Sequence, residues 1–232
     1  MQITRRQLLH RSALAAGAFC AAQSSPLIHA IPAAIQSPTK SETDNLFSRM
    51  TWFNEPASSK INGDELTVRS KPKTDFWQKT YDGYAADSGH FFHLPASGDF
   101  KFTALCNGNF ATQYDQNGLM VRIDADNWMR CGTEFIDGKR FASVVFTRTW
   151  SDGSTLPDLS QTAPIWWRLV RKNDSIETFL SLDGEKYMSV RMGYFPKEKT
   201  VQVGVMCCAP TGGPSFDSTF KSLKLEPASI AS

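Results

Sequence analysis

Aromatic and charged side chains alternate along residues 128–135. In an extended strand, Trp128, Arg130 and Glu134 share one face, with Gly132 between them. On that face Trp128 could stack on a sugar ring, and Arg130 and Glu134 could hydrogen-bond to its hydroxyl groups. A surface ion pair beside a partly packed tryptophan would show the same pattern. The segment is therefore a candidate carbohydrate-binding surface, with that structural alternative left open.

Two further arginines lie in segments that are otherwise apolar. Arg148 ends one such segment, and Arg168 lies in another. An arginine in this setting either pairs with a carboxylate, such as Glu134 or Asp124, or binds an anionic or hydroxylated ligand. The ion pair is the favoured interpretation. Trp166 shares a face with Arg168, so Arg148, Trp166 and Arg168 join the candidate ligand-binding residues.

Glu134 is also the candidate for acid–base chemistry. Glycoside hydrolysis needs two carboxylates about 5 to 9.5 Å apart. The positions two residues away from Glu134 are Gly132 and Ile136, and the glucanase pattern Glu-x-Asp-x-x-Glu is absent. Asp124 or Glu177 could supply the second acid from another strand. A polysaccharide hydrolase or lyase therefore stays an alternative, with Glu134 a weak catalytic candidate.

Other chemistries find little support in the sequence. His90 and His93 are three residues apart on an expected strand, hence on opposite faces, and no Gly-x-Ser-x-Gly or dinucleotide motif occurs. We expect no metal site and no cofactor. Buried free thiols are favoured over a Cys106–Cys131 disulfide, and at most one of the neighbours Cys207 and Cys208 can face a core.

The N-terminal 30 residues have the features of an export signal. Arg5 and Arg6 precede a short apolar segment rich in small residues, which favours a twin-arginine signal over a general secretory signal. We therefore expect export to the periplasm or the extracellular space by the twin-arginine (Tat) machinery, and no membrane span. Residues 31–49, rich in Pro, Ser, Thr and Ala, are expected to form a flexible linker.

The charge balance argues against nucleic-acid binding. The chain has 25 basic and 23 acidic residues, and three of the arginines lie in the expected signal. A mature chain from residue 31 would have 22 basic and 23 acidic residues, a net charge near −1. A basic stripe for nucleic acid is therefore absent.

The segments that must position these side chains are predicted to be β-strands. Apolar and polar residues alternate with a period of two from residue 50 to residue 226, separated by Gly, Pro, Asn and Asp turns, with no amphipathic helix. This pattern predicts an all-β, antiparallel sandwich or jelly roll, followed by a C-terminal tail over residues 227–232. Ser151–Pro164 has no periodicity and is expected to be a long loop.

Several segments together resemble one protein family, domain-of-unknown-function family 1349, which includes a yeast regulation-of-enolase protein. The resemblance covers about residues 50–226, and after Arg148 the chain departs from the family's usual Ser-Asp-Trp-Ser. It implies a concanavalin A-like lectin/glucanase sandwich with a ligand on its concave face or loops, and no known activity. The matching segments are Phe76–Thr80, Tyr114–Arg122, Trp128–Gly138, Ser143–Arg148, Trp167–Leu169, Ser181–Gly184 and Val203–Pro210.

The leading hypothesis from the sequence is an exported, non-catalytic domain that binds a glycan in a concave groove. A catalytic domain using Glu134 and a protein-binding regulatory module are the alternatives. The distance between Glu134 and the nearest second carboxylate separates the first two hypotheses.

Overall fold

The computed structural model describes residues 46–156, 159, 162–213 and 216–228 of the 232-residue chain. The predicted signal peptide lies outside these ranges, as does the predicted linker up to residue 45. The described part contains no helix with the length and hydropathy needed to cross a bilayer.

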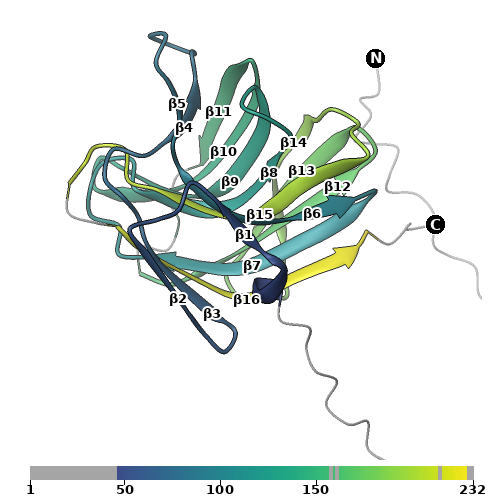
Figure 1. The fold of residues 1–232 in the computed structure, drawn as a ribbon, viewed down its shortest axis with the longest axis horizontal. Helices are drawn as coiled ribbons and strands as arrows, with labels where there is room; N and C mark the ends of the chain where they lie inside the picture. Colours follow the sequence, from purple (N-terminus) through teal and green to yellow (C-terminus); the bar gives the residue numbers. More distant parts are fainter. Residues whose placement is uncertain (1–45, 157–158, 160–161, 214–215, 229–232) are drawn as a thin grey trace, which may run out of the picture. The chain divides into compact units, whose positions relative to one another are not determined.

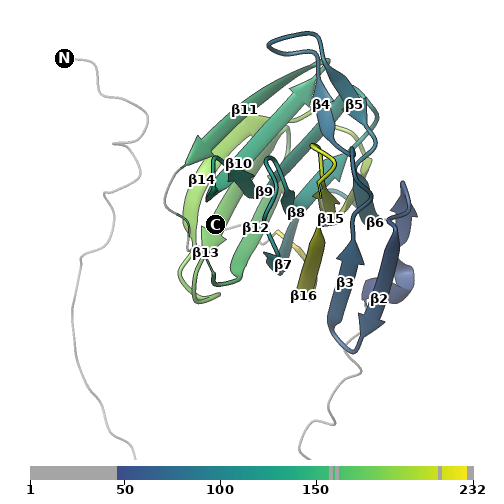
Figure 2. The same ribbon diagram turned by 90° about the vertical axis from the view of Figure 1, so that its left-hand side faces the viewer.

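Two seven-stranded antiparallel sheets form the fold (Figures 1 and 2). The order across the first sheet is β1 (Thr51–Phe53), β6 (His90–Ser97), β15 (Thr200–Cys208), β8 (Gln116–Arg122), β9 (Asn127–Ile136), β10 (Lys139–Arg148) and β11 (Trp150–Leu156).

The second sheet packs against the first. Its order is β14 (Met188–Tyr194), β13 (Ser175–Ser181), β12 (Ile165–Lys172), β7 (Phe100–Gly108), β16 (Asp217–Pro227), β3 (Glu65–Arg69) and β2 (Ser58–Asn62). A separate two-stranded hairpin, β4 (Phe76–Gln78) and β5 (Ala85–Asp87), stands out from the first sheet in Figure 1.

Alternating side chains explain why the two sheets pack. In β12, Ile165, Trp167 and Leu169 are fully buried between the sheets, whereas Trp166 and Arg168 are only partly buried on the outer face. Burying each large apolar side chain stabilises the fold by about 1.5 to 3 kcal/mol. The predicted all-β antiparallel sandwich is confirmed.

Two predicted boundaries differ from the structure. The expected loop at Ser151–Pro164 begins as a strand, because β11 pairs with β10 along Ala142–Arg148. The alternation of this strand is not visible in the sequence because most of its residues are polar or small. Only one face of this edge strand packs against the rest of the protein. A short 3-10 helix, Leu46–Arg49, precedes β1, and its Phe47 is buried in the core. The packed domain therefore begins before residue 50.

The four described cysteines are free and buried, as the sequence favours. Cys207 faces the core between the sheets, and Cys208 faces the opposite side of β15. Burial raises the pKa of the Cys207 thiol to about 12 and also raises the pKa of Cys106, Cys131 and Cys208. These thiols are therefore protonated at physiological pH.

A second apolar cluster lies on the outer face of the first sheet, the face turned away from the core. Phe76 of β4 covers it, and the ring centroids of Phe76 and Trp128 are 5.9 Å apart. The cluster anchors the hairpin to the sheet. Its buried members are Phe76, Phe91, Met120, Trp128, Val145, Met206 and Cys208.

Candidate functional site

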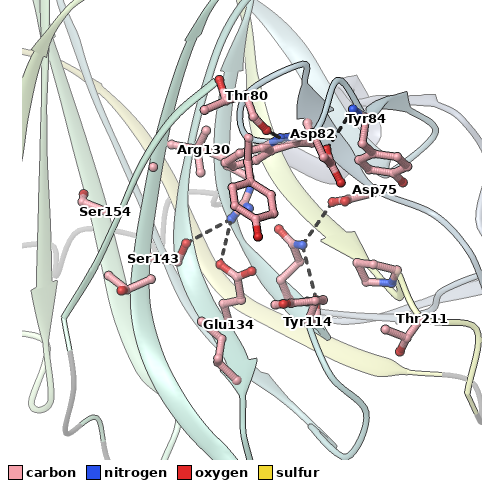
Figure 3. A pocket seen from close by; sticks show the side chains of 18 residues that line it. Asp75, Thr80, Asp82, Tyr84, Tyr114, Arg130, Glu134, Ser143, Ser154 and Thr211 are labelled. Carbon is pink, nitrogen blue, oxygen red and sulfur yellow. Dashed lines mark hydrogen bonds and ion pairs between the residues drawn. The ribbon is translucent and has the colours of Figure 1, made fainter. Parts of the chain in front are cut away.

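A cavity of about 730 Å³ lies on the outer face of the first sheet, between β8–β11 and the β4–β5 hairpin (Figure 3). Ligand pockets for small molecules typically have volumes of about 300 to 1,000 Å³. The lining residues are Asp75, Trp77, Thr80, Tyr81, Asp82, Tyr84, Tyr114, Gln116, Arg130, Glu134, Ile136, Ser143, Val145, Gly153, Ser154, Thr155, Pro210 and Thr211.

The β4–β5 hairpin forms one wall and is tied to the edge strand β11. The backbone amide of Gln78 donates to the Ser151 hydroxyl at 2.8 Å, and the Thr80 hydroxyl donates to the Ser151 carbonyl. The Trp77 indole donates to the Thr80 carbonyl at 2.9 Å. The Trp77 ring lies over Gly153 of β11, where a Cβ atom would be 3.5 Å from the ring. A Cβ at that distance would make ordinary van der Waals contact, so the indole packs closely over this part of β11.

Arg130, Glu134 and Ser143 lie on the sheet side of the cavity. Arg130 Nη1 lies 3.7 Å from Glu134 Oε2 and donates to Ser143 Oγ at 3.3 Å, as Figure 3 shows. Arg130 is buried and Glu134 half-buried. The guanidinium is thus held by its neighbours, and Glu134 Oε1 has no hydrogen-bond partner among the described residues.

A second carboxylate, Asp75, lines the same cavity. Its Oδ1 accepts hydrogen bonds from the Phe76 amide at 2.8 Å and from Gln116 Nε2 at 3.2 Å. Burial raises the pKa of Asp75, opposed by Arg130 and by the Phe76 hydrogen bond, and the nearby charge of Glu134 raises the pKa further. The cavity thus holds two carboxyl groups, and the charge of Glu134 acts on Asp75.

Two tyrosines at the cavity have left-handed backbone conformations. Tyr81 has φ 86° and is fully exposed, and Tyr114 has φ 68° and is also exposed. Positive φ is rare for bulky side chains and costs about 1 to 2 kcal/mol per residue. Strained residues of this kind are concentrated at functional sites. The fold therefore holds two aromatic rings in solvent at an energetic cost.

Trp128 lies on the predicted face but is not a stacking platform. It is fully buried in the second apolar cluster beneath Phe76, and its indole donates to the Ala125 carbonyl at 3.1 Å. The prediction was wrong because the β4–β5 hairpin, distant in sequence, covers this part of the face. Arg130 and Glu134 do line the cavity, as the strand alternation indicates.

Trp166 and Arg168 belong to the other sheet. Arg168 lies on the outer face of β12, with its guanidinium carbon 3.4 Å from the centroid of the Tyr187 ring and Nε donating to Thr103 Oγ1 at 3.3 Å. Trp166 lies against Gly184. Neither lines the cavity, so one groove containing them and Glu134 is excluded.

Arg148 is also outside the cavity. It lies at the end of β10, with its guanidinium carbon 5.5 Å from the centroid of the Tyr194 ring. The favoured carboxylate pairing is therefore replaced by aromatic contacts for both Arg148 and Arg168, and the described residues include no carboxylate that pairs with either.

The second acid is neither of the two that the sequence suggested. The Asp124 carboxylate caps its own turn by accepting from the Asn127 side chain, and Glu177 of β13 accepts from Ser189. Asp75 was missed because it precedes a three-residue strand with no visible alternation. The sequence signal for this side of the cavity is the high number of aromatic residues between Phe76 and Tyr84. A single apolar core does not need so many aromatic residues in one short segment.

The described residues contain no group of three or more His, Cys, Asp or Glu side chains arranged to hold a metal ion. His90 is buried and uses both ring nitrogens in hydrogen bonds, with the Lys71 amide and the Asn54 carbonyl. His93 contacts Gln202 from the opposite face of β6. The two histidines therefore have separate structural partners.

Known proteins similar to this chain fall into two groups. The chain is 34% identical over 166 residues to regulation of enolase protein 1 of Saccharomyces cerevisiae, which covers 72% of this chain and 84% of that protein. It is also similar to the crystal structure of a functionally unknown protein from Saccharomyces cerevisiae. That similarity has a TM-score of 0.76, 32% identity, and covers 79% of this chain and 98% of the other.

The second group shares the fold alone. A GH43 protein of Bacillus licheniformis, BlXynB, has a TM-score of 0.62 at 13% identity, over 78% of this chain and 37% of that one. An alginate lyase from Klebsiella pneumoniae has a TM-score of 0.54 at 9% identity, over 74% and 84%. The fold is an antiparallel β-sandwich of the jelly-roll kind, as the sequence predicts. Residues 52–228 match one family throughout, and the chain belongs to it: the family described as protein of unknown function (DUF1349).

Proposed function

We propose that the cavity on the outer face of the first sheet binds a carbohydrate. The observation that carries the proposal is the pair of exposed tyrosines, Tyr81 and Tyr114, held with positive φ at the cavity. Exposed aromatic rings offer flat apolar faces on which a sugar ring can stack. Backbone strain is often stored at functional sites, which supports a role for these two rings in ligand contact.

The polar groups of the cavity suit a ligand rich in hydroxyl groups. Arg130 supplies donors, and the carboxylates of Asp75 and Glu134 supply acceptors. Their positions are fixed by the Ser143 and Gln116 contacts, so little side-chain freedom is lost on binding. The sandwich fold is shared with a GH43 protein and an alginate lyase, which is consistent with this use and does not establish it.

A second candidate function is hydrolysis or elimination at a glycosidic bond. The raised pKa of Asp75 next to a Glu134 paired with Arg130 favours it, because catalytic acids and bases are often carboxyl pairs in different environments. An enzyme of this kind would lose turnover in Glu134→Gln and still bind its substrate. Reducing-end release from the same glycans, measured with the wild type and this variant, tests it.

The binding proposal is tested on a glycan array probed with the full chain. Tyr114→Ala should weaken binding to the best ligand by about tenfold, which corresponds to about 1.4 kcal/mol. Tyr194→Ala is the matched control, because Tyr194 is similarly exposed and lies on β14 of the other sheet. Absence of any binding, or equal losses in both variants, would refute carbohydrate recognition at this cavity.

A further inference from the structure

Acidic side chains outnumber basic ones in the cavity. Its lining includes three carboxylates, Asp75, Asp82 and Glu134, and a single cation, Arg130. Arg130 is already paired with Glu134. Burial raises the pKa of the Tyr84 hydroxyl, and Asp75 and Asp82 lie close enough for their charges to raise it further. The charge of Arg130 also acts on Asp75, so one lining cation serves three carboxylates, and Asp82 has no ion-pair partner among the described residues.

Several hydrogen-bond acceptors of the cavity are unused. Gln116 is buried, and its Nε2 donates to Asp75 and to the Tyr114 carbonyl, while its Oε1 has no partner in the described part of the chain. Asp75 and Asp82 each use only Oδ1, and the Oδ2 atoms have no partners among the described residues. A ligand that matches these atoms must bring donors.

The aromatic rings of the cavity also favour a positive charge. Trp77, Tyr81, Tyr84 and Tyr114 all line it. The face of an aromatic ring attracts a cation, and cages of such rings are a recurrent way of binding ammonium groups. The carboxylates, the unpartnered Gln116 Oε1 and the ring faces all match the same ligand group.

We propose that the carbohydrate bound here carries a protonated amino group, as in an oligosaccharide of glucosamine with free amines. This inference rests on the proposed function and names the substrate class of the same cavity. An ammonium group brings three donors and no acceptor. It would compensate the charges of Asp75 and Asp82, which a neutral sugar would desolvate without compensation. An anionic sugar would add like-charge repulsion.

The test compares two oligosaccharides that differ at one position of each ring. The β-1,4-linked tetramers of glucose and of glucosamine have the same backbone, with a hydroxyl or an ammonium group at carbon 2. Calorimetric titration of the full chain at a pH where the amines are protonated should show at least about tenfold tighter binding of the glucosamine tetramer. The N-acetylated tetramer, which is uncharged, should bind no better than the glucose tetramer.

The variant Asp82→Asn tests whether the preference for the glucosamine tetramer arises at this cavity. Asp82 is exposed on the β4–β5 turn, so the change is compatible with folding. It should lower the ratio of the affinity for the glucosamine tetramer to the affinity for the glucose tetramer by about tenfold. Asp174→Asn is the control, because it removes the same charge from an exposed turn between β12 and β13. It should change neither affinity.

The outcomes separate this inference from the proposed function. If the glucose tetramer binds as tightly as the glucosamine tetramer, or if Asp82→Asn and Asp174→Asn act alike, the amino-sugar inference is wrong and carbohydrate binding stands. If neither tetramer binds, the inference is wrong, and the glycan array decides the proposed function by itself.

Discussion

Among single residues, Tyr81 has a backbone conformation that lowers stability and a side chain that we expect to contact the ligand. Tyr81→Gly should relieve the left-handed strain, about 1 to 2 kcal/mol, against the extra chain entropy of glycine, about 0.5 to 1 kcal/mol. The fully exposed ring loses no burial. We therefore expect the free energy of unfolding in urea to rise by about 0.5 kcal/mol, while glycan affinity falls.

The control for Tyr81→Gly is Thr149→Gly. Thr149 also has positive φ, 65°, and lies in the turn between β10 and β11 outside the cavity lining. It should gain stability in the same way and keep its glycan affinity. If Tyr81→Gly lowers stability, the ring has packing that its exposure does not suggest, and the argument from strain fails.

Asp75 should give the protein a pH-dependent stability that Asp75→Asn removes. Burial raises the folded-state pKa of Asp75 above its unfolded value, which is about 4. The carboxyl group therefore costs no stability below pH 4 or so. The cost grows as pH rises from the unfolded to the folded pKa and stays constant above it.

The comparison is urea unfolding of the wild type and Asp75→Asn across a pH series. An asparagine keeps the oxygen that accepts from Phe76 and Gln116. The variant should be more stable than the wild type at neutral pH, and the difference should vanish in acid. A difference that is constant with pH would show that Asp75 is not desolvated in the folded protein.

Among the elements, the β8–β9 pair positions Arg130 and Glu134 and has no room for extra atoms. Gly132 lies between those two residues, and a Cβ there would be 2.0 Å from the Asn117 carbonyl oxygen. Gly132→Ala must push β8 and β9 apart, and we expect a loss of at least about 2 kcal/mol in urea unfolding. Gly153→Ala is the control, since its Cβ would make ordinary contact with Trp77 at 3.5 Å. Equal stability of the two variants would contradict this close packing.

The sequence predicts strands and faces better than it predicts what covers them. Alternation correctly placed Arg130 and Glu134 together on one face of β9. It could not show that Phe76, some fifty residues earlier, buries Trp128. It also could not assign Trp166 and β9 to different sheets, because strand order across a sandwich is a tertiary property.

For the whole molecule, we propose export through the paired arginines of the N-terminal segment. Replacing Arg5 and Arg6 by lysine preserves charge and removes the twin-arginine motif. The doubly substituted precursor should therefore remain in the cytoplasm, as measured by fractionation and immunoblotting. Substitution of Arg11 alone, outside the pair, is the control and should leave export intact. Normal export of the double variant would exclude this route.

The place where the ligand binds is the most direct test of carbohydrate recognition at the cavity. Amide NMR of the isotopically labelled full chain, titrated with the strongest ligand from the array, measures this directly. The largest shifts should fall on the β4–β5 hairpin, on Tyr114 and on the outer face of β8–β10 around Arg130 and Glu134. Shifts gathered instead around Trp166 and Arg168 on the second sheet would place the site on the opposite face and contradict the assignment.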